Sequence, residues 1–295
     1  MLRRLAFALM LSLVASLTVF SQIVPQTVFP FPQIAIGQMG DGNEFRTQVI
    51  LTNPSEREAF GTMDFLDDEG RDITLWVRSL RTGELRRVTG VLPFRIKSGV
   101  TTVWELSSAD SVRSGSSIVS TDYRDGGNGV RISGTAAYGI FDERGNILSL
   151  AGVGASGFIT DAFVPILDDS SRAMNTGIAF TTVLPTTIFF SLLDDNGNTL
   201  ATAQASYRDG IHRALFYNEI FGRPPYSRLT IRSVRIISNN PIATIAIQMA
   251  GNTLTSLPVV AIAGVSYKAG DAPLDLGGIL RRRHSTMDLS AAPMP

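Results

Sequence analysis

The chain has 295 residues, with 26 Lys and Arg balancing 26 Asp and Glu, and it contains two His and no Cys. Balanced charge gives no electrostatic basis for binding nucleic acid, which depends on clustered Lys and Arg. The lack of Cys excludes disulfides, thiolate zinc sites, iron–sulfur clusters and cysteine nucleophiles. With 44% hydrophobic residues, the chain has enough apolar material for a folded core.

Residues 1–21 have the pattern of a secretory signal peptide. Arg3 and Arg4 form a basic start, an uncharged and mostly apolar run reaches Phe20, and small residues at Val19 and Ser21 suit a cleavage site. The apolar run is shorter than the ~20 residues that span a bilayer as a helix, so cleavage is favoured over a retained anchor. We therefore expect export to the periplasm or beyond, with no membrane span in the mature chain.

From position 22 to 265 the apolar runs are short, rich in β-branched residues and bounded by Gly, Pro, Asn and Asp. This spacing predicts an all-β sandwich or barrel. The clearest predicted strands are 48–52, 62–66, 178–182, 187–192 and 242–247. The apolar repeat of a long helix is missing, and residues 103–110 and 215–221 are expected to form single helical turns.

Three segments, 67–70, 142–145 and 194–197, begin with Asp and end with Gly. Asp side chains hydrogen-bond the backbone of a turn, and Gly takes the positive φ that closes a hairpin, so each segment predicts a hairpin turn. A calcium loop is the alternative, because clustered carboxylates before a Gly resemble the start of an EF-hand. No Glu follows at the twelfth position and no helices are expected on either side, which favours the hairpin turn.

The chain also resembles itself. Three pairs of similar segments follow one another in the same order: 65–71 with 192–198, 99–104 with 210–215, and 141–148 with 248–254. Such self-similarity indicates two copies of one structural unit. Each copy has the size of a single sandwich domain. The first copy has insertions at 76–91 and 121–131, where a function private to that copy would lie.

The order of the short motifs carries a resemblance to a known group. These motifs are Phe29-Pro30, Leu51-Thr-Asn-Pro54, Val164-Pro165, Asn240-Pro-Ile-Ala243 and Leu257-Pro-Val-Val260. Together they resemble the tandem Ig-like β-sandwich modules of uncharacterised secreted bacterial proteins, over about residues 29–260. The resemblance implies two tandem antiparallel Ig-like β-sandwich domains and no assigned catalytic or binding residue. The expected divisions are a signal peptide at 1–21, a first sandwich at 22–156, a second sandwich at 157–266 and a disordered tail at 267–295.

Motifs with a chemical meaning are few. Gly152–Gly157 satisfies Gly-x-Gly-x-x-Gly, but the β-like segment after it cannot place a helix N-terminus against a pyrophosphate, so a linker is expected. His212 has Asp209 close in sequence, but a nucleophile Ser on a strained elbow is missing, so His212 is expected to be a surface residue at a strand start. We expect no cofactor and no metal.

Adjacent carboxylates keep one enzyme class open. Glycoside hydrolysis needs two Asp or Glu about 5 to 10 Å apart across a cleft. The adjacent pairs are Asp67 with Asp68, Asp168 with Asp169, and Asp194 with Asp195. Neighbouring strand or turn residues point apart, so solvated carboxylates are the favoured interpretation and a glycosidase is the least favoured function.

Aromatic rings give the candidate binding residues, because exposed rings can stack on sugars. Trp104 lies in an alternating apolar run and is expected in the core, whereas Trp76 and Tyr123 lie in or beside the insertions and are candidate glycan contacts. Core or loop packing is the competing interpretation for both. The expected function is a non-catalytic structural or adhesive protein with an unknown protein partner. A carbohydrate-binding module for a cell-surface glycan is the alternative.

The end of the chain differs in composition. After Val265 it is rich in Gly and Pro and then carries Arg281–Arg283. Three Arg can contact an anionic surface, but a solvated tail is the simpler interpretation.

Overall fold

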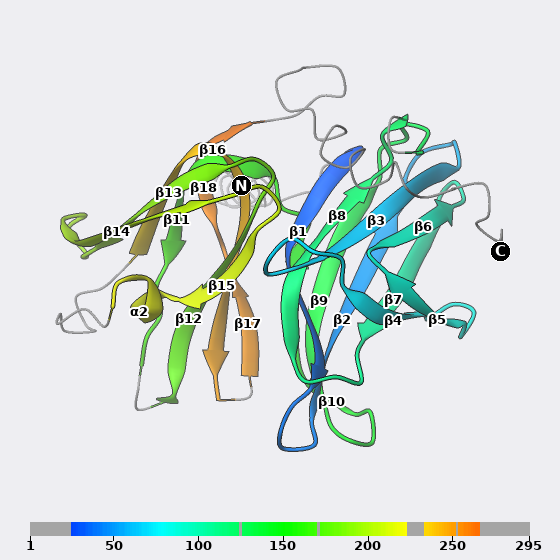
Figure 1. The fold of residues 1–295 in the computed structure, drawn as a ribbon, viewed down its shortest axis with the longest axis horizontal. Coiled ribbons are helices and arrows are strands. Elements are labelled where there is room, and N and C mark those ends of the chain that lie inside the picture. The colour runs from blue at the N-terminus through cyan, green and yellow to red at the C-terminus, as the bar shows by residue number, and fades with distance from the viewer. Residues whose placement is uncertain (1–24, 124–125, 170–171, 223–232, 252, 266–295) are drawn as a thin grey trace, which may run out of the picture.

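The computed structural model describes residues 25–123, 126–169, 172–222, 233–251 and 253–265. The predicted signal peptide at 1–21 and the predicted tail at 267–295 lie outside these residues. Within them the chain is all-β with antiparallel pairing, as predicted, and its strands form two groups that lie side by side (Figure 1). Among the described residues, no helix has the length and apolarity needed to cross a bilayer.

The first unit comprises β1 to β10 and has two layers. One layer consists, in spatial order, of β1 (Val28–Gln38), β8 (Arg113–Ser120), β3 (Ala59–Asp67) and β6 (Val91–Ile96). The other consists of β5 (Leu85–Thr89), β4 (Thr74–Ser79), β7 (Thr101–Ser107), β2 (Glu44–Thr52), β9 (Ser133–Phe141) and β10 (Ile147–Gly154). The last two residues of β1 pair with β2, so β1 joins the layers.

Alternating side chains from both layers fill the space between them. On β2, Val49 and Leu51 are fully buried, and they belong to one apolar cluster with Phe65 of β3. Trp104 is only 6% exposed and packs its ring 6.1 Å from that of Phe94, which confirms the predicted core position. Residues 103–110 are not a helical turn, because most of this segment is strand β7 and its apolar residues follow the two-residue period of a sheet.

The second unit comprises β11 to β18 and is organised around one long strand, β16 (Ser233–Ala250). The first half of β16 pairs with β11 (Phe158–Pro165) and β13 (Thr186–Leu193), which pair in turn with β18 (Val260–Val265) and β14 (Thr199–Tyr207). The second half pairs with β12 (Met174–Thr182) and β17 (Thr253–Leu257), and β12 pairs with β15 (His212–Phe216). Helix α2 (Tyr217–Ile220) is a single turn within the predicted segment 215–221.

β16 changes partners at Asn239, Asn240 and Pro241. The Asn239 side chain accepts a 2.8 Å hydrogen bond from the Thr187 backbone N–H, and the Asn240 amide donates one of 2.8 Å to the Pro185 carbonyl. Pro241 has no N–H for a ladder, so it suits the place where one set of partners ends and another begins.

The two units share one order of strand pairing. β11 and β13 flank the first half of β16 as β1 and β3 flank β8, and β14 corresponds to β6. The second half of β16 pairs with β12 and β17 as β9 pairs with β2 and β10, and β15 corresponds to β7. The pairing of β1 with β2 and that of β11 with β18 have no counterpart in the other unit's described residues. The similar segments 99–104 and 210–215 lead into the corresponding strands β7 and β15. The β4–β5 hairpin, close to the predicted insertion 76–91, has no counterpart in the second unit's described residues.

The three Asp-to-Gly turns have one geometry. Gly70, Gly145 and Gly197 have φ of 70°, 80° and 81°. In each turn the Asp side chain accepts hydrogen bonds from the backbone N–H groups two and four residues later. The turns at 142–145 and 194–197 join paired strands, which confirms the predicted hairpins. The turn at 67–70 does not, because the chain then crosses to β4 in the other layer.

Candidate functional site

Trp76 lies on the solvent side of strand β4. Leu75 and Val77 on either side of it are buried, and Trp76 itself is 38% exposed. It is paired with Arg87 of β5, so these two side chains lie on the same face of the sheet. The structure therefore places this candidate glycan contact on the surface of the hairpin that is private to the first unit.

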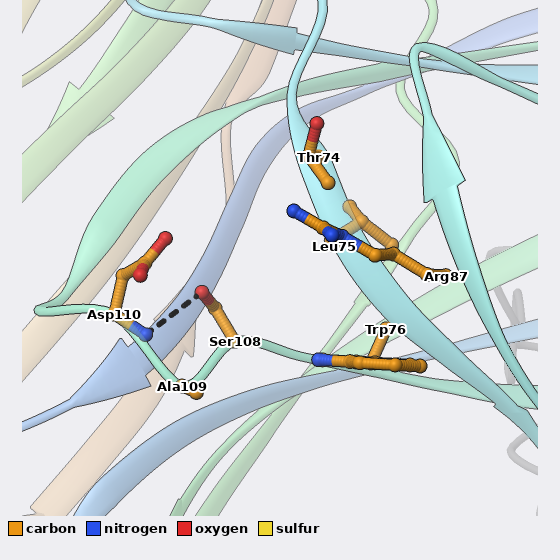
Figure 2. Close-up of a pocket in the computed structure, with 7 residues that line it drawn as sticks. All are labelled: Thr74, Leu75, Trp76, Arg87, Ser108, Ala109 and Asp110. Carbon is orange, nitrogen blue, oxygen red and sulfur yellow. Dashed lines mark hydrogen bonds between the residues drawn. The ribbon is translucent and has the colours of Figure 1, made fainter.

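A hollow of about 170 Å³ lies beside the Trp76 ring (Figure 2). It is lined by Thr74, Leu75, Trp76, Arg87, Ser108, Ala109 and Asp110. Figure 2 shows the indole edge-on with its nitrogen toward Ser108, and Arg87 reaching across from β5. The Ser108 hydroxyl accepts a 3.2 Å hydrogen bond from the Asp110 backbone N–H. A flat ring with a guanidinium donor, a carboxylate acceptor and a hydroxyl can bind a polar ligand that has an apolar face.

Tyr123 does not line the hollow beside Trp76. It follows β8, in the layer opposite β4, and it is 71% exposed. The hollow thus holds one of the two predicted glycan contacts, and Tyr123 lies apart from it.

His212 is fully buried, so its expected place on the surface is wrong. Its Nδ1 lies 2.7 Å from Asp68 Oδ1, and its Nε2 lies 2.8 Å from Gln33 Oε1. Both partners belong to the first unit, whereas His212 begins β15 of the second. The neighbour Asp209 is not its partner. The prediction missed this contact because Asp68 is 144 positions away.

The backbone around His212 is anchored to β12. The Gly210 N–H donates to the Thr182 carbonyl at 2.8 Å, and the Ile211 N–H donates to the Thr182 hydroxyl at 3.1 Å. Gly210 has φ of 72°, a left-handed conformation that glycine adopts without strain. These bonds fix the start of β15 and aim the imidazole at the first unit.

Ser114, Asp68 and His212 have the side chains of a hydrolase triad but not its order. The Ser114 hydroxyl donates to Asp68 Oδ1 at 2.9 Å, so the carboxylate lies between the hydroxyl and the imidazole. A catalytic triad places the imidazole in the middle, where it removes the proton from the hydroxyl. Here the far imidazole nitrogen contacts Gln33. The arrangement therefore links two units and does not activate Ser114.

The carboxylate of Asp68 is favoured in its ionised form. Partial burial raises its pKa, but hydrogen bonds from His212 and Ser114 and charge interactions with His212 and Arg213 outweigh burial, and the pKa is lowered below its usual value. Arg213 also donates to the Asp68 carbonyl at 2.7 Å and to the Glu69 carboxylate at 3.1 Å. Arg208 donates to the Glu69 carbonyl at 2.8 Å. Two arginines of the second unit thus hold the turn that follows β3.

We call this contact region the seam; its polar residues are Gln33, Asp68, Glu69, Ser114, Ser116, Thr181, Arg208, His212 and Arg213. The Thr181 hydroxyl donates to the Ser116 hydroxyl at 3.2 Å in its buried part. Beside it, Ile118 of the first unit packs with Phe158, Val183 and Ala243 of the second. Polar and apolar contacts together join the two units.

The remaining sequence motifs have structural roles. The carboxylates of Asp67 and Asp194 accept hydrogen bonds from their own turns, and Asp168 accepts one from the Tyr217 hydroxyl. In the Gly-rich segment, β10 continues to Gly154 and β11 begins at Phe158, so the connection is only 155–157. Across the described ranges, no three His, Cys, Asp or Glu side chains are grouped to hold a metal ion.

Comparison with known proteins identifies no family. No family model matches the chain, and no curated protein matches it. Solved structures with some similarity include vicilin from Corylus avellana (hazelnut), with 8% identity, a TM-score of 0.23, and coverage of 81% of this chain and 85% of that one. The coconut allergen cocosin has 8% identity, a TM-score of 0.23, and coverage of 82% and 87%. Recombinant pro-11S globulin of pumpkin has 8% identity, a TM-score of 0.21, and coverage of 89% and 83%. Scores this low establish neither a shared fold nor a function.

Proposed function

We propose that this chain is an exported, non-catalytic interaction protein in which two tandem Ig-like β-sandwiches are held together as one rigid body. The observation that supports this most is the seam. Among the described residues, its His, Ser and Asp side chains come nearest to a catalytic set, and their hydrogen bonds join the two units. A partner would then bind to exposed faces and loops, and two rigidly joined sandwiches hold these surfaces in a fixed arrangement.

The tandem arrangement is supported by the strand pairing. A shared pairing order in both units, with similar segments on corresponding strands, is what a duplicated sandwich would produce. The first unit's extra β4–β5 hairpin then lies where an acquired function is expected.

A second candidate function, glycan recognition, rests on Trp76. Its ring is exposed beside Arg87, Ser108 and Asp110, and these groups suit the apolar face and the hydroxyls of a sugar. The hollow is small, so it would hold one sugar ring or part of one.

One experiment separates a protein partner from a glycan. The mature chain, residues 22–295, is immobilised and exposed to isolated cell-envelope fragments that are untreated, protease-treated or periodate-treated. Binding that protease abolishes and periodate spares is expected for a protein partner. Binding that periodate abolishes, and that is lost in Trp76→Ala but kept in the control Phe189→Ala, would favour the glycan. Phe189 is a suitable control because it is an exposed aromatic residue of the second unit. If the immobilised chain retains no envelope fragment, both proposals are contradicted.

A further inference from the structure

A pocket of about 390 Å³ opens at the seam between the two units. The first unit contributes residues of β1, β2, β8 and β9, and the second contributes residues of β12, β15, β16, β17 and α2. Pockets of this size at the junction of two domains commonly bind small molecules. It is separate from the hollow beside Trp76 and shares no lining residue with it.

The walls of this seam pocket are mostly apolar. Those from the first unit include Phe45, Val112 and Tyr138, and those from the second include Leu215, Phe216 and Met249. Ile178 and Tyr138 are buried, whereas Val112 is 43% exposed at the mouth. An occupant would therefore bury apolar surface on both units at once, which favours binding through the hydrophobic effect.

Gln33 and Ser114 are the uncharged polar side chains that line the seam pocket, and the Ser114 hydroxyl already donates to Asp68. Gln33 is held at two points. The Tyr138 hydroxyl donates to its backbone carbonyl at 2.7 Å, and its side-chain Oε1 lies 2.8 Å from His212 Nε2. Gln33 is only 9% exposed, and its amide nitrogen has no hydrogen-bond partner among the described residues. If the amide oxygen and nitrogen are interchanged, the oxygen becomes the free group, so the carboxamide offers one hydrogen-bonding atom in either orientation.

The charge of the lining excludes anionic occupants. No Lys, Arg or His is among the lining residues, and the one carboxylate, Glu219, is exposed at the rim and accepts a 2.7 Å hydrogen bond from the Phe216 N–H. A carboxylate or phosphate entering the pocket would lose its hydration and gain no cation. An ammonium would find only the rim carboxylate, outside the apolar interior.

We infer that the seam pocket binds an uncharged, largely apolar small molecule with one hydroxyl or carbonyl group, which hydrogen-bonds to the Gln33 carboxamide. Because a water molecule occupies about 30 Å³ of liquid, the pocket has room for roughly a dozen non-hydrogen atoms. This binding is distinct from the proposed interaction function, since it uses neither the envelope nor the hollow beside Trp76.

The test uses three ten-carbon probes, decan-1-ol, decanoate and decylammonium, with the mature chain. Titration followed by amide NMR shifts should show decan-1-ol binding saturably at one site, with decanoate and decylammonium at least tenfold weaker. Ala214→Trp should block the site, because Ala214 lines the pocket and is itself exposed, so the larger side chain needs no space in the core. Ala261→Trp, at an exposed alanine of β18 outside the pocket, is the matched control and should bind normally.

Gln33→Leu tests the hydrogen bond and should weaken decan-1-ol binding about five- to tenfold, the range expected when one neutral hydrogen bond is lost. Because Gln33→Leu also removes a hydrogen-bond partner of His212, it can destabilise the fold. If Gln33→Leu does not fold, Ala214→Trp alone tests the site. The inference is overturned if decan-1-ol does not bind below its solubility limit, if Ala214→Trp binds it as the unmodified chain does, or if decanoate binds more tightly than the alcohol. Each of these results leaves the envelope-binding proposal intact.

Discussion

His212 Nδ1 lies 2.7 Å from Asp68 Oδ1, so the first residue of β15 is tied to the turn that follows β3, 144 positions earlier in the chain. The imidazole is fully buried, while the Asp68 side chain keeps 48% of its exposure. The carboxylate thus retains part of its hydration, which lowers the desolvation free energy of forming the Asp68–His212 pair. Removing the imidazole would leave Gln33 and Asp68 without their shared partner.

His212→Ala should destabilise the protein by about 2–4 kcal/mol, through a cavity and two lost hydrogen bonds. The free energy of unfolding from urea titration measures this. His212→Asn is the matched variant, since its amide can still donate to Asp68 but does not reach Gln33, and it should lose about half as much. An unchanged unfolding midpoint in His212→Ala would show that the seam contributes little to stability.

The lowered pKa of Asp68 predicts how stability changes with pH. Because the folded state favours the ionised carboxylate, the stabilisation is present above the unfolded-state pKa of about 3.9 and is lost as pH falls through the lower folded-state value. The stability difference between the unmodified chain and Asp68→Asn should therefore be largest near neutral pH and shrink below about pH 4. Thermal unfolding across this range tests it, and high salt should reduce the difference because Asp68 is half-exposed. A difference that grows on acidification would contradict the assignment.

Local pattern was enough to predict the turns and much of the core. Asp194–Gly197 adopts its predicted hairpin because every hydrogen bond of the turn comes from within five residues. Trp104 follows the two-residue alternation of its own strand, so its burial needs no knowledge of the partner strand. Val103–Asp110 was wrongly expected to be helical, since a short apolar run has no clear period until its pairing with β2 and β4 is known.

The local sequence pattern does not predict the seam. His212 looks like a surface residue from its neighbours Gly210 and Arg213, and its burial depends on Gln33 and Asp68, which the fold brings to it from another unit. Likewise the seam pocket exists only where two units meet. Among the residues that line the hollow beside β4, Trp76 had a local signal, its place in an insertion.

The turn glycines offer a matched test of the seam's close packing. Gly70 and Gly197 end equivalent turns with φ of 70° and 81°. A Cβ at Gly70 would lie 2.6 Å from the Gly210 carbonyl oxygen of the other unit, whereas a Cβ at Gly197 would meet nothing within 4 Å. Gly197→Ala should therefore cost only the left-handed backbone penalty of about 1 kcal/mol. Gly70→Ala should cost a further 1–2 kcal/mol or so, because the units must move apart. Equal losses in urea unfolding would argue that the two turns have the same surroundings.

Replacing Trp104 with Ala should lower the stability of the protein, whereas replacing Trp76 with Ala should affect binding and leave stability nearly unchanged. Trp104→Ala removes a ring that is 6% exposed and packed against Phe94, so it should destabilise the chain by about 3–5 kcal/mol. Trp76→Ala removes a ring that is 38% exposed, and the unfolding free energy should change by about 1 kcal/mol or less. Urea unfolding of the two variants side by side makes the comparison.

Because Trp76→Ala leaves the fold in place, any loss of envelope binding in that variant reports on the hollow itself. A destabilisation by Trp76→Ala as large as that by Trp104→Ala would instead mean that the Trp76 ring supports the β4–β5 hairpin, and the glycan candidate would lose its main support.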